Sequence, residues 1–180
     1  IPSIIDSAQI LAYYDGSDLG TFGEYKNTIK ALKQITPKVA IDSTNTGDST
    51  ILANKLHNKD VLIFIEREAQ TNVNYTVLKN TIKNYIDTGG VVIFCSDNVY
   101  DHRLTTLNLF SGTYMGTSGN ITFNILNSID PLVQNVSPPF IGVYDTYPII
   151  FSNPDIVNLV SQAQGSGVAY RNIGYGKVIY

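Results

Sequence analysis

The sequence predicts a three-layer α/β domain, in which helices cover both faces of a parallel β-sheet. Over the first two thirds of the 180 residues, short apolar runs alternate with stretches whose apolar residues recur every three or four positions. Continuous apolar runs are typical of strands that are buried on both faces, and the second spacing is typical of helices. Repeated strand–helix–strand units produce parallel strands joined by right-handed crossovers. We expect residues 1–180 to form one domain, either complete or cut from a longer chain.

The first strand is predicted at residues 10–14, an apolar run that ends at the polar turn 15–18. The next segment predicts a helix that Pro37 ends, since its apolar residues follow helical spacing: Phe22, Tyr25, Ile29, Leu32 and Ile35. Residues 39–41 are predicted to form the second strand. A polar loop then leads to a short helix around Leu52, with Asp48 or Ser49 as its N-cap.

The clearest unit begins after Asp60. Residues 61–65 form a continuous apolar strand, and the spacing of Val77, Leu78, Ile82, Tyr85 and Ile86 predicts a helix after it. Gly89 and Gly90 end that helix, and residues 91–94 form the next strand.

The pattern is weaker beyond Asp97. We expect a short helix over 104–110, a glycine-rich loop over 111–119, a half-exposed strand at 121–125 and a helical turn at 130–133. Five further short strands are predicted at 140–144, 149–151, 156–160, 168–170 and 178–180.

Composition excludes several functions. Lys and Arg number 12 against 15 Asp and Glu, and charged residues make up only 15%, so the clustered positive charge of a nucleic-acid-binding protein is missing. No apolar run approaches the roughly 20 residues of a membrane span. One cysteine and two histidines predict neither a disulfide framework nor a transition-metal site. We expect no metal and no cofactor.

Several segments resemble the class I glutamine amidotransferase-like superfamily, in particular its trehalose-utilisation (ThuA-like) branch. In that branch a helix that ends in a Gly-Gly pair leads into the strand before the active-site turn, as Gly89-Gly90 and residues 91–94 do here. Residues 130–136 are similar to a turn of the branch, and residues 168–180 are similar to its closing hairpin. The resemblance covers about residues 10–180 and implies a flavodoxin-like, three-layer fold.

Catalytic members of that superfamily carry a cysteine nucleophile on a sharp turn flanked by small residues. Cys95 stands at this position, directly after the strand 91–94, but Asp97 stands where glycine is expected. The His-x-Glu pair of the amidotransferases and the histidine of the ThuA-like branch have no counterpart in these residues. The resemblance therefore implies the fold without the catalytic residues.

Cys95 has two interpretations, which stay open at this point. It is a small buried residue at a strand end, or it is a nucleophile activated by His102, seven residues further along. His57 is interpreted as a surface residue near a helix end.

A ligand-binding crevice is predicted at the carboxyl ends of the parallel strands, where strand order reverses. Its candidate residues are Asp15, Ser17 and Asp18 after the first strand, Glu66 and Glu68 after the third, and Ser96 and Asp97 after the fourth. Such an oxygen-rich edge suits a polyol or a divalent cation, but acidic residues also favour loops for structural reasons. We expect at most weak divalent binding.

Two other families share fragments of this pattern. Asp15-Gly16-Ser17 resembles the start of the metal-adhesion motif of von Willebrand A domains, but Leu19 replaces its next serine. Response-regulator receivers need an aspartate where Glu66 stands.

The predicted function is therefore a non-catalytic binding or scaffolding domain of an exported or envelope bacterial protein. The alternative is a Cys-dependent hydrolase, amidotransferase-like or sugar-active enzyme that uses Cys95. The expected partner is another protein domain or subunit, which would cover the apolar last strand; a carbohydrate is a second candidate. The low charge favours a periplasmic or extracellular location, with the cytoplasm as the alternative, although no signal peptide is visible.

Overall fold

The computed structural model describes residues 8–35, 38–95, 102–115, 121–137, 140–142, 148–163 and 165–180. The first part of the chain alternates strands and helices: β1 (Gln9–Tyr13), α1 (Glu24–Ile35), β2 (Ala40–Thr44), α2 (Ser49–Leu56), β3 (Val61–Phe64), α3 (Tyr75–Asp87) and β4 (Val91–Phe94). The second part is mainly β: α4 (Arg103–Thr106), β5 (Gly112–Tyr114), β6 (Ile121–Ile125), β7 (Phe140–Gly142), β8 (Ile149–Phe151), β9 (Val157–Gln162), β10 (Gly165–Ile173) and β11 (Gly176–Ile179).

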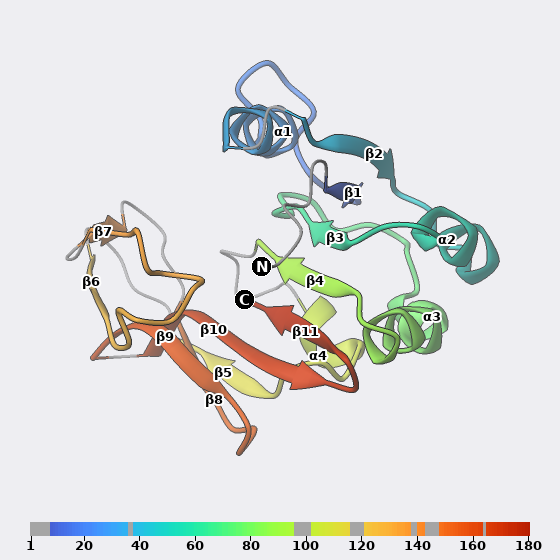
Figure 1. The fold of residues 1–180 in the computed structure, drawn as a ribbon. Helices are drawn as coiled ribbons and strands as arrows, with labels where there is room; N and C mark the ends of the chain where they lie inside the picture. Colours follow the sequence, from blue (N-terminus) through green and yellow to red (C-terminus); the bar gives the residue numbers. More distant parts are fainter. Residues whose placement is uncertain are drawn as a thin grey trace.

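The strands form one mixed sheet in the order β2-β1-β3-β4-β11-β10-β9-β6-β7. The first five strands in this order are parallel, and β10 pairs with β11 in the antiparallel direction. The predicted α/β fold with a flavodoxin-like parallel sheet is thus confirmed (Figure 1). Strand order reverses at β1, which lies between β2 and β3.

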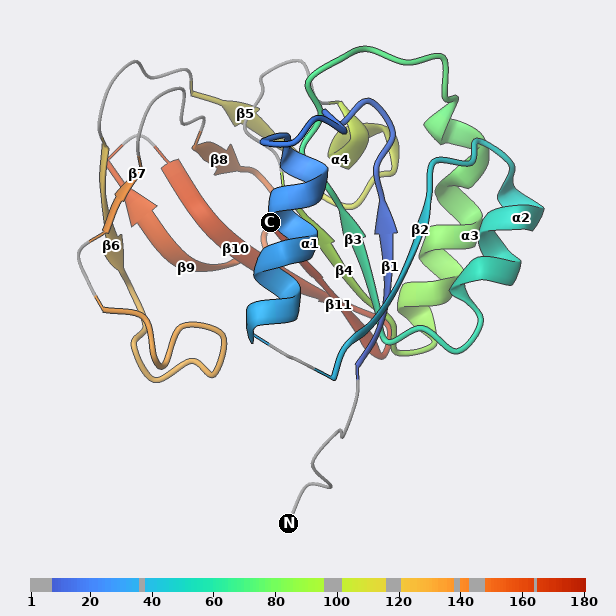
Figure 2. The same cartoon turned by 90° about the horizontal axis from the view of Figure 1, so that it is seen from above.

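Helices cover both faces of the parallel sheet, as Figures 1 and 2 show. Alternate side chains of β1, β3 and β4 pack against α2, α3 and α4 in the larger apolar cluster, which includes Leu11, Leu62 and Val92. The side chains between them, including Ile10 and Ile63, face α1 in a smaller cluster. This alternation is what a strand period of two requires when both faces are covered.

The predicted ends of two helices are confirmed. Asp48 is the N-cap of α2, where its side chain accepts hydrogen bonds from the backbone nitrogens of Thr50 and Ile51. After α3, Gly89 adopts a φ of +110°, and its backbone nitrogen donates to the Ile86 carbonyl. Glycine tolerates this backbone conformation because it has no Cβ.

Other expectations were wrong in detail. Phe22 lies outside α1 and is 89% exposed, and Ile35 is 80% exposed, so only the middle of the predicted stripe faces the sheet. Val77 is also half exposed. Tertiary contacts form strand β5 within the segment predicted as a glycine-rich loop, because β5 pairs with β8. The predicted helix at 104–110 is confined to α4.

The later strands extend the sheet away from the parallel part (Figure 2). A third apolar cluster holds β6 and β9 together around Phe123, Leu159 and Val160. The last of the predicted short strands, β11, inserts between β4 and β10 and pairs with β4 in parallel. Val178 and Tyr180 are buried in the larger apolar cluster of this chain, so the expectation that a partner is needed to cover the last strand was wrong for these residues. Among the helices of the described residues, none is long and apolar enough to cross a membrane.

Candidate functional site

Cys95 follows β4 directly, at the carboxyl edge of the parallel sheet. Its backbone nitrogen donates to the Phe64 carbonyl at 2.9 Å, and its side chain packs against the apolar cluster on the α1 face. Burial raises the pKa of the thiol to about 11; Arg103 opposes this shift and Glu66 adds to it. At neutral pH the sulfur is therefore protonated, the form that is neither a nucleophile nor a metal ligand.

His102 is the residue before α4, and its side chain is exposed. It makes no side-chain capping bond to α4, and it is not among the groups that shift the pKa of the Cys95 thiol. Among the described residues, the charged groups that act on the Cys95 thiol are Arg103 and Glu66. The structure thus brings no histidine among the described residues to the thiol as a base.

Asp15 is buried just beyond β1, only 6% exposed. Its Oδ2 accepts hydrogen bonds from the Thr71 hydroxyl and the Tyr75 hydroxyl, each at 2.5 Å. Burial, together with the bond to Asp15, raises the pKa of the Tyr75 phenol. These two hydrogen bonds connect the β1–α1 loop to the segment that leads into α3. The Asp15 Oδ2 is therefore already engaged within the protein.

The same two loops meet through the backbone at Gly16. Its carbonyl accepts hydrogen bonds from the backbone nitrogens of Glu68 and Ala69 at 2.9 and 3.0 Å. Gly16 has a φ of +74°, and a Cβ there would lie 2.3 Å from the Ala69 oxygen. Only glycine permits this approach, which holds Glu68 beside the β1–α1 loop.

Ser17 and Asp18 continue the β1–α1 loop. Asp18 is exposed; its Oδ1 accepts from the Gly20 nitrogen at 2.7 Å, and its own backbone nitrogen donates to Glu24 Oε2 at 3.1 Å. The Ser17 hydroxyl oxygen is buried and has no hydrogen-bond partner among the described residues. Through these two hydrogen bonds, Asp18 fixes the backbone of the loop that leads into α1.

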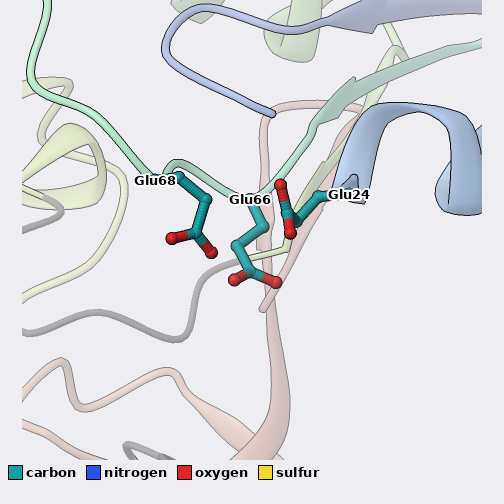
Figure 3. A group of neighbouring side chains, drawn as sticks. All are labelled: Glu24, Glu66 and Glu68. Atoms are coloured by element: carbon teal, nitrogen blue, oxygen red, sulfur yellow. The ribbon is translucent and has the colours of Figure 1, made fainter. Parts of the chain in front are cut away.

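Three carboxylates gather where α1 begins and β3 has ended: Glu24, Glu66 and Glu68 (Figure 3). One oxygen from each lies within 4.8 Å of the others. Glu24 and Glu66 are partly buried, and Glu68 is exposed. This arrangement offers three hard oxygen ligands, which is half or fewer of the six to eight that Ca²⁺ takes.

The sequence predicted Glu66 and Glu68 as neighbours but missed Glu24. The signal for Glu24 was its place in the first turn of a helix that follows the first strand, where carboxylates are favoured. Ser96 and Asp97, the remaining predicted crevice residues, lie outside the described residues.

Arg103 was also missed. It is 1% exposed, its Nη1 donates to the Ile65 carbonyl at 3.0 Å, and its guanidinium lies 5.6 Å from the centre of the Phe64 ring. It places a fixed positive charge under the carboxyl edge of the sheet, close enough to act on Cys95. A single basic residue in a weakly patterned segment carries no sequence signal for such burial.

Comparison with known proteins identifies the fold. No protein-family model and no curated protein matches the sequence. Among solved structures, a ThuA-like protein from Bacteroides uniformis superposes with a TM-score of 0.63 and 16% identity, covering 96% of this chain and 80% of that one. A glutamine amidotransferase from Thermotoga maritima superposes with a TM-score of 0.56 and 11% identity, covering 96% of this chain and 74% of that one. An exo-β-1,4-mannosidase from an Opitutaceae bacterium superposes with a TM-score of 0.56 and 12% identity, covering 97% of this chain and 31% of that one.

These neighbours confirm the predicted resemblance at the level of the fold. The chain has the architecture of ThuA-like and glutamine amidotransferase-like proteins. The match to less than a third of the mannosidase chain shows the same architecture within a longer polypeptide.

Proposed function

We propose that this chain, which has the fold of ThuA-like and glutamine amidotransferase-like proteins, is a non-catalytic binding or scaffolding domain of an exported or envelope bacterial protein. The observation that carries the proposal is the state of Cys95. The thiol occupies the position of the amidotransferase nucleophile in the sequence pattern, but burial raises its pKa to about 11. An activated cysteine needs the opposite shift, produced by a nearby cation or a helix N-terminus.

The surroundings of Cys95 support the same proposal. Among the described residues, Arg103 is the one cation that acts on the thiol, but desolvation outweighs it and Glu66 opposes it. Asp15, the most buried carboxylate among the described residues of the predicted crevice, is already bonded to Thr71 and Tyr75. The Asp15 carboxylate is thus engaged in holding the two loops together.

The proposed binding surface is the carboxyl edge of the parallel sheet. Exposed Asp18 and Glu68 and partly buried Ser17, Glu24 and Glu66 present oxygen atoms there. In open parallel sheets, ligands bind at this edge beside the point where strand order reverses. Another protein domain or subunit is the proposed partner, and the low charged fraction of 15% favours an exported protein.

Thiol reactivity tests the proposal, and the single cysteine makes the measurement unambiguous. The folded protein is treated with iodoacetamide across pH 6.5 to 10, and the labelled fraction is measured by intact-mass spectrometry. A pKa near 11 gives on the order of 100-fold less thiolate at pH 7.5 than an ordinary cysteine, so we expect labelling to be about that much slower than in the urea-unfolded protein.

The competing function is an enzyme that uses Cys95, with His102 as its base. What favours it is the location of Cys95 directly after β4, at the edge where active sites of such folds lie. If the labelling rate rose with pH to a midpoint below pH 8, and if His102→Ala lowered that rate, the enzyme would be supported and the binding domain overturned. The variant His57→Ala is the matched control, because His57 is exposed at the end of α2.

A further inference from the structure

A groove of about 370 Å³ runs along one flank of helix α1. α1 lies at the end of the sheet where β2 is the last strand, and Figure 1 shows no other helix of the described residues beside it. No neighbouring helix of the described residues therefore fills the groove. The residues that line it all belong to α1 in the described part of the chain: Tyr25, Lys26, Ile29, Lys30, Lys33 and Gln34.

The groove lies on the flank of α1 that is opposite the acidic cluster. Consecutive helix residues are about 100° apart, so the three groove lysines lie roughly 120–180° around the helix from Glu24. Glu24 gathers with Glu66, beyond the end of β3. Tyr25, on the side facing the sheet, hydrogen-bonds through its hydroxyl with the Ser43 hydroxyl of β2 at 2.6 Å. The lysines therefore lie on the β2 side of the molecule, away from the carboxylates.

The groove carries positive charge that the described residues do not neutralise. α1 contains three lysines and one acidic residue, Glu24, although the chain as a whole has a net charge of −3. Among the described residues, no salt bridge joins a groove lysine to a carboxylate, whereas Lys59 pairs with Asp42 and Lys83 with Asp87. The groove is thus a local excess of positive charge on an acidic protein.

The apolar side chains of α1 are less completely covered than those of α3. None of the residues of α1 is fully buried. Tyr25 and Ile29 pack partly against the smaller apolar cluster, and their exposed parts line the groove. An additional segment in the groove would complete the burial of these two side chains, as tertiary packing does for the apolar stripe of α3. The buried residues of α3 are Tyr75, Leu78, Ile82 and Ile86.

This combination favours an acidic protein segment over other anionic partners. Protein interfaces combine an apolar centre with a charged rim, which matches two half-buried apolar side chains beside three lysines. Phosphate groups are recognised by arginine forks, and anionic lipid surfaces by clusters of roughly four to eight basic residues. The described lining contains three lysines and no arginine. Tyr25 and Ile29 are also too deeply packed to insert into a bilayer.

We propose that the flank of α1 formed by Lys26, Lys30 and Lys33 docks an acidic segment of a partner protein. Carboxylates of the segment lie opposite the lysines, and an apolar side chain of the segment packs on Tyr25 and Ile29. The charges orient the segment and exclude basic partners, and the apolar contact adds affinity. This inference rests on the proposed role as a binding domain and adds a surface that is separate from the carboxyl edge of the sheet.

A peptide array tests the proposal. Each member has twelve residues, with three glutamates and two leucines at varied spacings in a glycine–serine background. Matched sets replace the glutamates by glutamine or by lysine, or the leucines by serine. The tightest peptides are then measured in solution with the folded protein by fluorescence anisotropy. We expect glutamate–leucine peptides to bind in the micromolar range, more weakly as NaCl is raised, and the three matched sets to bind at least tenfold more weakly.

The groove is tested by the triple variant Lys26→Gln, Lys30→Gln and Lys33→Gln. Glutamine removes the charge and has a helix propensity similar to that of lysine. Each exposed ion pair contributes little by itself, so we expect the loss of all three to weaken binding of the acidic peptide by about tenfold.

The matched control is the triple variant Lys55→Gln, Lys79→Gln and Lys83→Gln. These lysines belong to α2 and α3, on the opposite face of the sheet, so the net charge changes equally while the groove stays intact. We expect it to bind the acidic peptide as the natural protein does. Circular dichroism and urea unfolding establish that both variants are folded.

Weaker binding in the groove variant alone supports the docking surface. Absence of peptide binding, equal binding of glutamate and glutamine peptides, or equal losses in the two variants overturns it. Sedimentation with phosphatidylglycerol vesicles that the groove variant abolishes and no acidic peptide competes with would assign the lysines to a lipid surface, and also overturns it. None of these results affects the iodoacetamide measurement, so failure of this surface is distinguishable from failure of the proposed non-catalytic function.

Discussion

At the scale of single residues, Asp15 and Tyr75 form a buried polar contact between segments 60 positions apart in the chain. The Tyr75 ring also lies 6.2 Å from the Tyr13 ring and 5.8 Å from the Arg67 guanidinium. Phenylalanine would preserve the ring contacts but remove the hydroxyl that donates to the carboxylate. The hydroxyl and the ring can therefore be separated experimentally.

We expect Tyr75→Phe to lower the free energy of unfolding by about 1.5–3 kcal/mol, the usual range for a hydrogen bond to a charged group. Urea unfolding followed by circular dichroism measures the change. Tyr175→Phe is the control, since Tyr175 is 92% exposed and should change stability by less than about 0.5 kcal/mol. Equal losses in the two variants would show that the Asp15 contact contributes nothing.

The raised pKa of the Cys95 thiol predicts that the protein loses stability at alkaline pH. Its folded-state pKa, about 11, lies above that of an unfolded cysteine, so the folded protein retains a proton that the unfolded chain releases. The resulting stabilisation is complete below about pH 8.5, the unfolded pKa, and is lost as pH rises towards 11. Between pH 8 and pH 10 we expect a loss on the order of 1–2 kcal/mol.

The measurement is urea unfolding at pH 8 and pH 10 for the natural protein and Cys95→Ala. The alanine variant should lose less stability over this interval, because it has no thiol to ionise. Burial also raises the pKa values of Tyr13, Tyr75 and Tyr85, whose contributions are lost at higher pH and are common to both proteins. Identical pH dependence of the two proteins would contradict the raised pKa of the Cys95 thiol.

At the scale of elements, α2 illustrates how much a short helix depends on its cap. It has eight residues, and only Leu52 and Leu56 are buried in it. Asp48 satisfies two of its free backbone nitrogens, with bonds of 2.7 and 2.9 Å. A helix this short is marginal without packing and caps.

Asp48→Ala should therefore cost about 1 kcal/mol of stability, measured as a shift in the midpoint of urea unfolding. Asp48→Asn retains a capping oxygen and should cost clearly less. If asparagine proved as destabilising as alanine, the negative charge rather than the hydrogen bonds would be the stabilising feature.

At the scale of the whole molecule, the acidic cluster arises only because α1 returns to the sheet edge where β3 ends. Glu24, Glu66 and Glu68 have too few oxygens for a tight divalent site, and Glu68 is exposed. We expect 5 mM CaCl₂ or MgCl₂ to raise the melting temperature by less than about 2 °C, as a dissociation constant of about 5 mM or weaker would.

Thermal unfolding with NaCl at matched ionic strength provides the reference. A rise of several degrees with either divalent cation, abolished by Glu66→Gln, would replace the weak-binding prediction with a specific cation site. A similar rise with NaCl would instead report screening of like charges.

Local sequence signals were sufficient to predict the parallel core and several of its boundaries. The apolar runs at 61–65 and 91–94 predicted β3 and β4 because a strand covered on both faces must be apolar at successive positions. The local signals at Asp48 and Gly89 predicted where α2 begins and α3 ends, because capping involves neighbours within a few residues. The position of Cys95 after β4 followed from the same local pattern.

The environment of these residues depends on segments that are far away along the chain. The donors to Asp15 come from positions 56 and 60 residues away, and Arg103 reaches a carbonyl 38 residues away. The insertion of β11 beside β4 and the approach of Glu24 to Glu66 likewise depend on distant segments. Burial and charge at a site are sums over neighbours in space, and periodicity along one segment contains no information about which distant segment supplies them.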